Sequence, residues 1–258
     1  MKQNNVISLS GGKDSTAMLL MMLERGEDIH SVIFFDTGWE FPQMYDHIDK
    51  LEEYTGQKIW RLHPSLPFEY WMLARPIRSQ KNRPKIGIKK GDVYRIGNGW
   101  PDAKQRWCTL IKRNVLAMFQ KAIQNSVSCI GYAKDEEKRT KAKWMNPTNT
   151  RFPLQEYGVT EANALEYCYK HGFDWGGLYE HLHRVSCFCC PLQVLGNLRA
   201  IRKHFPALWQ KMLVWDSMQP DHNQGFYGYK TVHDLEGRFA EEDRQTDFFV
   251  DGIENFTP

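Results

Sequence analysis

The chain has 258 residues, of which 41% are hydrophobic, and a formal net charge of only +3. This composition is ample for a hydrophobic core and excludes a uniformly polycationic protein, and the length fits one large domain or a main domain with an appendage. No stretch is long and apolar enough to span a bilayer, and the N-terminal MKQNNVISLSGG has no apolar run of the secretory kind. We therefore expect a cytoplasmic protein without a membrane partner, whose six cysteines are reduced, ligating or catalytic rather than disulfide-bonded.

The first 62 residues alternate between short β-rich runs and helical patterns. Strands are predicted at 6–9, 30–35 and 58–62, and helices at 14–25 and 42–54. This βαβαβ order predicts an α/β fold with a doubly wound parallel sheet, helices on both faces and right-handed crossovers.

The regular pattern fades after Pro64, where prolines and glycines punctuate a basic insertion at about 75–103. Between Arg75 and Arg95 there are eight basic residues and a single acid, Asp92. We predict an irregular excursion or loop. Its charge favours a polyanionic partner such as a nucleotide or a nucleic acid, with a solvated basic loop as the alternative.

Regular elements return beyond the insertion, and the acids gather near the C-terminal end of the chain. The predicted elements are a helix at 104–122, a strand at 127–132, a polar loop at 136–149, a helix at 160–171 capped by Thr160, and helices over 192–218 with a break at Pro206. We expect an α/β domain at 1–157, which contains the insertion, and a mainly helical region at 158–258 with a cysteine cluster and an acidic tail.

The turn at residues 10–15, with the sequence SGGKDS, separates the first strand from the first helix. Glycines let a backbone approach a bulky anion, and the N-terminus of the helix offers unpaired N–H groups. Two serine hydroxyls and the Lys13 charge complete a phosphate cradle, although the spacing is that of neither the Walker nor the Rossmann loop. Asp14 fits such a site if Mg²⁺ bridges its carboxylate to the phosphates.

This turn resembles the S-G-G-x-D-S motif of the PP-loop nucleotide (adenine nucleotide alpha) hydrolases, which grip the pyrophosphate of ATP and cleave between the α and β phosphates. The segment FDTGWEFP at residues 35–42 resembles the D-T-G-x-x-F-P motif of the phosphoadenosine phosphosulfate (PAPS) reductase branch of that superfamily. By that resemblance, the backbone around Phe34 to Asp36 would hold adenine and ribose.

Two looser matches follow. Gly131-Tyr132 with Asp135, Glu136 and Arg139 falls where the branch has a glycine and an acidic, arginine-containing motif. Arg139 is the candidate there for a phosphate or sulfate contact. FPLQEY at 152–157 resembles P-L-x-x-W with tyrosine in place of tryptophan, so the resemblance spans about residues 4–191.

The turn and the resemblance together define two sets of candidate site residues. The nucleotide-binding set is Ser10, Gly11, Gly12, Lys13, Asp14, Ser15, Phe34, Phe35, Asp36, Thr37, Gly38 and Gly131. The catalytic set is Lys13, Asp14, Cys108 and Arg139.

Cys187 and Cys190 form a C-x-x-C pair followed by proline, a spacing that lets two thiolates bind one metal centre. In the related adenylylsulfate reductases and DNA-phosphorothioation enzymes, cysteines at similar places hold a [4Fe-4S] cluster. By that resemblance Cys108, Cys187 and Cys190 are ligands, with Cys189 as the nearest fourth and Cys168 as its alternative. A structural Zn²⁺ and metal-free thiols stay open, whereas Cys129 and Cys168 fit the hydrophobic core.

Three functions remain in competition. The first is a PP-loop enzyme that uses ATP or a related adenine nucleotide to adenylylate a substrate, with sulfur transfer to a nucleic acid or nucleobase from a sulfur-donor protein as one version. The second is a thiol-dependent reductase of PAPS or adenylylsulfate. PAPS reductases attack with a cysteine in a C-terminal Glu-Cys-Gly-x-His motif, and this chain has no cysteine after Cys190. The third is a non-catalytic nucleotide- or nucleic-acid-binding module. The sequence leaves the oligomeric state open.

Overall fold

The computed structural model describes residues 3–141, 149–220 and 225–254, so half of the predicted loop at 136–149 lies outside the described residues. The chain forms two compact units. The first unit consists of Met1–Ser65 and Cys108–Phe188, and the second of Leu66–Trp107 and Cys189–Pro258. These limits differ from the expected division at 157/158, because residues 158–188 belong to the first unit and the basic insertion belongs to the second.

The first unit is built on a five-stranded sheet in the order β3-β2-β1-β6-β7, in which every neighbouring pair is parallel. The strands are β1 (Asn4–Leu9), β2 (Ile29–Phe35), β3 (Ile59–Leu62), β6 (Ser126–Ile130) and β7 (Thr150–Arg151). The strand order changes direction between β1 and β6. Open α/β sheets bind ligands beyond the carboxyl ends of the strands at such a switch point.

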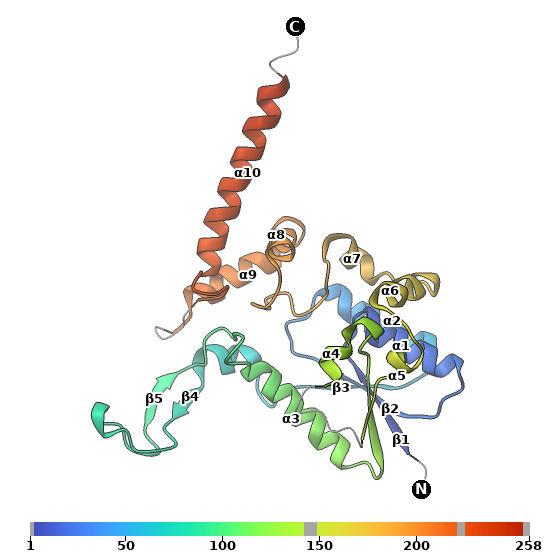
Figure 1. Ribbon diagram of the computed structural model, residues 1–258. Coiled ribbons are helices and arrows are strands. Elements are labelled where there is room, and N and C mark those ends of the chain that lie inside the picture. Colours follow the sequence, from blue (N-terminus) through green and yellow to red (C-terminus); the bar gives the residue numbers. More distant parts are fainter. Residues whose placement is uncertain (1–2, 142–148, 221–224, 255–258) are drawn as a thin grey trace. The chain divides into compact units, whose positions relative to one another are not determined.

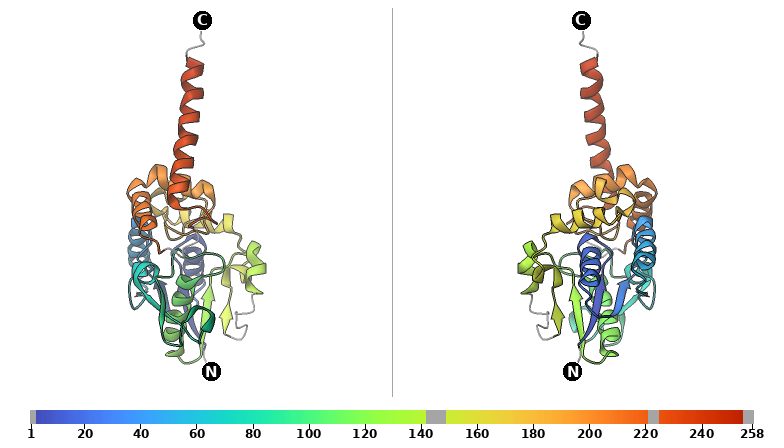
Figure 2. Two further views of the ribbon diagram at one scale, coloured as in Figure 1. Left: turned by 90° about the vertical axis from the view of Figure 1, so that its left-hand side faces the viewer. Right: turned by 90° about the vertical axis from the view of Figure 1, so that its right-hand side faces the viewer.

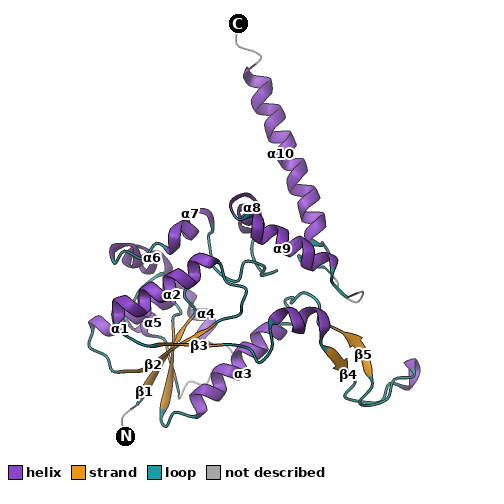
Figure 3. Cartoon of the chain, turned by 180° about the vertical axis from the view of Figure 1, so that it is seen from behind, coloured by secondary structure: helices purple, strands orange, loops and turns teal. Residues whose placement is uncertain are grey.

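The helices that connect these strands cover both faces of the sheet, which confirms the predicted α/β fold. Helices α1 (Lys13–Glu24) and α2 (Pro42–Thr55) lie on one face, and α3 (Trp107–Lys121) lies on the other, as Figures 1 and 3 show from opposite sides. This follows from right-handed crossovers, since the chain runs outward from β1 to β3 and then returns to β6. With both faces covered, Val6, Ile7, Val32 and Ile33 are completely buried.

Four short helices complete the first unit, namely α4 (Glu137–Thr140), α5 (Pro153–Glu156), α6 (Glu161–Lys170) and α7 (Leu178–His181). Helix α6 packs against α1. Its predicted cap is present, because the Thr160 side chain accepts a hydrogen bond from the backbone N–H of Asn163 at 3.3 Å. This packing brings a segment from the second half of the chain to the helix that follows the glycine turn.

The second unit joins the insertion to the C-terminal helices. The insertion forms an antiparallel hairpin of β4 (Pro76–Arg78) and β5 (Val93–Ile96), where an irregular loop was predicted. Helices α8 (Leu195–His204) and α9 (Pro206–Ser217) meet at the predicted break, and α10 (Val232–Glu254) is one uninterrupted helix (Figure 2). Among the described residues, no helix combines the length and apolar composition needed to cross a membrane.

Candidate functional site

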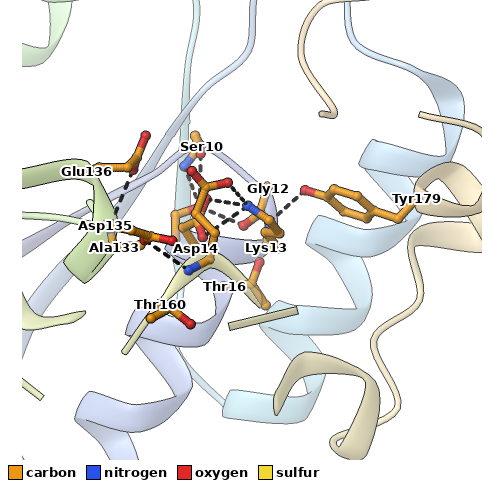
Figure 4. Close-up of polar contacts among 12 residues, drawn as sticks. Ser10, Gly12, Lys13, Asp14, Thr16, Ala133, Asp135, Glu136, Thr160 and Tyr179 are labelled. Atoms are coloured by element: carbon orange, nitrogen blue, oxygen red, sulfur yellow. Dashed lines mark hydrogen bonds and ion pairs between the residues drawn. The ribbon is translucent and has the colours of Figure 1, made fainter. Parts of the chain in front are cut away.

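The glycine turn lies between the carboxyl end of β1 and the first turn of α1 (Figure 4). The Ser15 Oγ atom is 3.1 Å from the backbone nitrogen of Ser10 and 3.1 Å from the carbonyl oxygen of Gly12, so it closes the turn on itself. Gly11 has a φ of +80°, and a Cβ there would stand 2.3 Å from the Met44 sulfur. The positive φ favours glycine at this position, and any larger residue would also displace the Met44 side chain.

Gly131, a member of the predicted nucleotide-binding set, follows β6 and lies directly against this turn. A Cβ on Gly131 would lie 2.9 Å from both the nitrogen and the Cα of Ser15, and 3.0 Å from the carbonyl carbon of Asp14. All three contacts are backbone atoms, which cannot move aside as a flexible side chain can. The absence of a side chain therefore lets the loop after β6 approach the start of α1 at the topological switch point.

Lys13 and Asp14 form the charged centre of the site. The Lys13 ammonium lies 3.1 Å from Asp14 Oδ2 and 2.6 Å from Glu161 Oε2 of α6. Burial disfavours the charged lysine, but these carboxylates outweigh it and raise the pKa of Lys13. Burial also raises the pKa of Asp14 to about 6, against the opposing effect of Lys13. Asp14 is therefore ionised at neutral pH at some cost in stability.

A second layer of contacts comes from residues 174–179, which sequence reasoning missed. The Trp175 indole donates to the carbonyl oxygen of Gly11 at 2.7 Å, and the Tyr179 hydroxyl accepts from the backbone N–H of Lys13 at 2.9 Å. Trp175 stacks on His47 with ring centroids 4.6 Å apart. The His47 ring bonds Thr16 of α1 at 3.0 Å, and burial lowers its pKa to about 3. The indole of Trp175 and the neutral imidazole of His47 thus hold the turn and the start of α1 in place through hydrogen bonds.

The same two rings, His47 and Trp175, border a pocket of about 110 Å³. Its lining residues are Gln43, Asp46, His47, Lys50, Phe173, Asp174, Trp175 and Gly176. No part of this pocket was predicted from the sequence, since its lining residues at 43–50 and 173–176 belong to no motif.

The segment after β2 is held by its own side chains. The Asp36 carboxylate accepts from the backbone N–H of Gly38 at 2.7 Å and from the Tyr45 hydroxyl at 2.9 Å. The Thr37 hydroxyl donates to Glu40 at 2.8 Å. Phe34 and Phe35 are buried in the core, so their side chains cannot face a nucleotide. The expected contribution of 34–36 to adenine and ribose binding is thereby limited to the backbone, and it stays a prediction.

Arg139, the predicted phosphate contact, is engaged locally in α4. Its guanidinium pairs with Glu136 and lies 4.1 Å from the centre of the Tyr132 ring. Glu136 in turn accepts from the backbone N–H of Ala133 at 3.3 Å. A direct role for Arg139 at the phosphates would require it to leave these partners.

The predicted ligand cysteines are divided between the units. Cys108 and Cys187 belong to the first unit, and Cys189 and Cys190 to the second. The Cys187 sulfur lies 3.5 Å from the Thr37 hydroxyl and 3.6 Å from Glu40. In the described part of the chain, no group of three or more His, Cys, Asp or Glu residues is arranged to hold a metal ion. The four-cysteine site stays a prediction.

The two remaining cysteines are buried, as expected for core residues. The Cys168 thiol donates to the carbonyl oxygen of Lys13 at 3.4 Å, beneath the glycine turn. Burial raises the pKa of both Cys129 and Cys168 to about 12, so neither thiol ionises readily to the thiolate that binds metals. Cys168 is therefore the weaker candidate for the fourth ligand.

Known proteins resemble this chain in sequence and structure. The uncharacterized protein MJ0066 of Methanocaldococcus jannaschii is 27% identical over 229 residues, which cover 84% of this chain. The chain spans only 42% of the length of that relative.

Two solved structures were compared, and both are 15% identical to this chain. The PAPS reductase from Candida auris in its phosphate complex gives a TM-score of 0.44, covering 70% of this chain and 78% of its own. The U34-tRNA thiolase NcsA from Methanococcus maripaludis, with its [4Fe-4S] cluster, gives 0.42, covering 93% of this chain and 72% of its own.

The family assignment comes from sequence. The model of the phosphoadenosine phosphosulfate reductase domain matches residues 4–193, which is well over half of the chain. The matched region includes the glycine turn, the DTG segment, Gly131 and the cysteines at 187–190. The chain therefore belongs to the phosphoadenosine phosphosulfate reductase domain family.

Proposed function

We propose that this protein is a PP-loop enzyme that binds ATP or a related adenine nucleotide, cleaves it between the α and β phosphates and adenylylates a substrate. One observation carries the proposal: the glycine turn lies at the carboxyl end of β1 at the switch point of the sheet, with the Gly131 backbone against it. Parallel sheets bind phosphorylated ligands at this place.

The proposed reaction is an in-line displacement. An oxygen or nitrogen of the acceptor bonds to the α phosphorus, the bond from that phosphorus to the bridging oxygen breaks, and pyrophosphate leaves with the electron pair. Lys13 and the backbone N–H groups of the turn would stabilise the charge that develops on pyrophosphate. Glu161 would have to share or release Lys13, which it holds at 2.6 Å.

The residues present fit a bound Mg²⁺. Magnesium in nucleotide sites takes one or two carboxylates and completes its shell with phosphate oxygens and water. Asp14 supplies such a carboxylate at the turn, with its side chain 24% exposed. Mg²⁺ bound there would neutralise phosphate charge. The [4Fe-4S] cluster, or Zn²⁺ as its alternative, at Cys108, Cys187, Cys189 and Cys190 stays a prediction, and no step above depends on it.

We further propose a nucleic acid as the acceptor. Sulfide-level sulfur from a donor protein would then replace the adenylylated oxygen on the acceptor, and AMP would leave with that oxygen. The support is the basic arm, which we define as residues 75–96. Its cations Arg78, Lys81, Lys85, Lys89 and Lys90 are exposed. Arg83 and Arg95 flank the Tyr94 ring at 4.4 and 5.6 Å from its centre. Exposed cations suit phosphates, and the arginine-flanked ring in the same arm suits unstacked bases.

The decisive test of nucleotide cleavage is pyrophosphate release from ATP by the purified chain with Mg²⁺ and a panel of RNA and DNA acceptors. Asp14→Ala should lower the rate by about 100-fold or more, since it removes the carboxylate at the phosphates. Asp49→Ala is the control, because Asp49 is exposed on α2 and pairs with Arg61. Release at the normal rate by Asp14→Ala would contradict the proposal.

The nucleic-acid proposal predicts a steep loss of affinity with salt. Replacing Lys85, Lys89 and Lys90 by Gln should reduce the slope of log K against log salt by about 2, since each phosphate contact contributes about 0.7–0.9. The same change at Lys58, Lys121 and Lys170 of the first unit is the control. Equal slopes for the wild type and the arm variant would mean that the arm is a solvated loop.

A thiol-dependent reductase is the second candidate, and the position of Cys187 favours it. This thiol lies beside Thr37, in the segment predicted to hold the nucleoside. Sulfite release from PAPS or adenylylsulfate with a thiol reductant, lost in Cys187→Ser, would support this activity, and no turnover of either compound would remove it. The third alternative, a non-catalytic module, predicts tight nucleotide binding with no pyrophosphate release under any condition.

A further inference from the structure

The Tyr179 hydroxyl lies at the rim of the glycine turn. Its oxygen accepts from the backbone N–H of Lys13 at 2.9 Å and stands 3.4 Å from where a Cβ on Gly12 would be. Figure 4 shows the ring entering from the side of the turn opposite to Glu136. The phenol therefore covers one of the amides that a phosphate would otherwise meet at the start of α1.

A tyrosine hydroxyl can accept hydrogen bonds and can donate one. Here the accepting side is used by Lys13, whereas within the described residues no acceptor receives the hydroxyl proton. An unmet donor at a partly buried site costs free energy unless a ligand or water meets it. Burial also raises the pKa of Tyr179, so the proton is retained throughout the physiological range.

The ring of Tyr179 is held by an unusually constrained neighbour. Trp175 adopts a φ of +54°, which side-chain-bearing residues rarely occupy, and it is only 2% exposed. Its ring meets Tyr179 edge to face at 4.8 Å, while its indole bonds Gly11 on the same turn. Backbone strain of this kind persists where the surroundings enforce it, often at functional sites. The Trp175 anchor thus fixes the phenol relative to the turn.

We propose that Tyr179 is a phosphate-binding residue, whose O–H donates to a non-bridging oxygen of the pyrophosphate portion of the nucleotide while its oxygen keeps the Lys13 amide. This inference rests on the proposed function and names a ligand contact for it. The Lys13 N–H would then donate to the phenol oxygen, and the phenol O–H would donate to the phosphate. Two hydrogen bonds in such a chain polarise and strengthen each other.

The test is equilibrium binding of Mg²⁺–ATP and of inorganic pyrophosphate to the full chain and to Tyr179→Phe. Loss of a hydrogen bond to a charged oxygen should weaken both ligands by about tenfold or more. Tyr169→Phe is the matched control, because Tyr169 is 42% exposed on α6. A thermal unfolding curve for each variant shows whether weaker binding comes from the missing hydrogen bond to the ligand or from a less stable protein.

Trp175→Phe supplies a second variant. It removes the bond to Gly11 and loosens the phenol, so it should weaken both ligands, and adding it to Tyr179→Phe should cost less than the sum of the two. Unchanged affinity in Tyr179→Phe overturns the inference, and so does tighter binding, which would make the phenol a competitor of the phosphate. Those outcomes leave the proposed function standing. Absence of binding to the wild type would instead remove the proposed function and this inference together.

Discussion

The two units of this chain differ in how their contacts relate to the sequence. In the first unit, β1, β2 and β3 follow one another along the chain and pair side by side in the sheet. In the second, the Trp100 indole donates to Asp216 at 2.9 Å across 116 positions, and Trp100 packs against Trp215 and Phe226. The order of strands and helices in the first unit therefore follows from local periodicity, whereas the second unit is joined by partners that no local pattern identifies.

Asp216 is the central hydrogen-bond acceptor of the second unit. Its carboxylate is buried and accepts from the Trp100 indole and from the backbone N–H groups of Val232 and His233, at the start of α10. One side chain of α9 thus connects the insertion to the start of α10. The following predictions test the contrast between the units, from the largest expected effect to the smallest.

Asp216→Ala should destabilise the second unit by about 3–4 kcal/mol, because it leaves two buried donors and one partly buried donor without their charged acceptor. Urea unfolding followed by tryptophan fluorescence measures this loss. The control is Asp243→Ala, whose side chain is 63% exposed and which should cost under about 1 kcal/mol. Equal losses in the two variants would show that Asp216 does not hold the second unit together.

Gly131→Ala should cost about 2–3 kcal/mol and abolish nucleotide binding, since the new methyl group meets backbone at 2.9 Å. Gly196→Ala in α8 is the matched change in the other unit, where a Cβ meets nothing within 4 Å. There the higher helix propensity of alanine should raise stability by about 0.5–1 kcal/mol. Normal nucleotide binding by Gly131→Ala would contradict the close approach of β6 to α1.

Asp14→Asn should stabilise the protein above pH 6 while it removes activity. The folded-state pKa of about 6 lies above the ordinary aspartate value of 3.8, so the stability contributed by protonated Asp14 is present below about pH 4 and is lost as the pH rises through 6. At pH 8 the unfolding free energy of the variant should exceed that of the wild type by about 2 kcal/mol. The difference in unfolding free energy between the variant and the wild type should vanish by pH 4. A difference that does not change with pH would contradict the raised pKa of Asp14.

Thr160→Ala should cost about 1 kcal/mol, the usual value of an N-cap. Thr160→Ser retains the acceptor for the Asn163 amide and should be nearly neutral, so thermal unfolding of the pair isolates the cap. A loss of equal size in both variants would point to the missing methyl group instead.

The sequence was sufficient for the parts of the site that lie next to each other along the chain. The turn, its strand and its helix could be predicted because residues 6–25 carry both the period and the motif. Gly131 was found by family resemblance. Glu161, Trp175 and Tyr179 were missed, because they reach the turn across 148, 164 and 166 positions and belong to no motif.

The basic insertion shows a different limit. Its glycines and prolines predict an irregular loop, yet Gly97 bonds Arg75 and a Cβ there would stand 2.4 Å from the Met72 carbonyl oxygen. These residues close a hairpin rather than interrupt one. Glycines and prolines predict where the backbone turns. They do not predict which of the segments between the turns pair as strands, as β4 and β5 do here.

The alternation of the chain between its two units has a consequence for synthesis on the ribosome. Residues 66–107 emerge early, but Asp216, the acceptor of the Trp100 indole, is translated more than a hundred codons later. The intervening residues 108–188 meanwhile complete the parallel sheet. The second unit can therefore close around Trp100 only after Asp216 has been synthesised, so its folding must follow translation of nearly the whole chain.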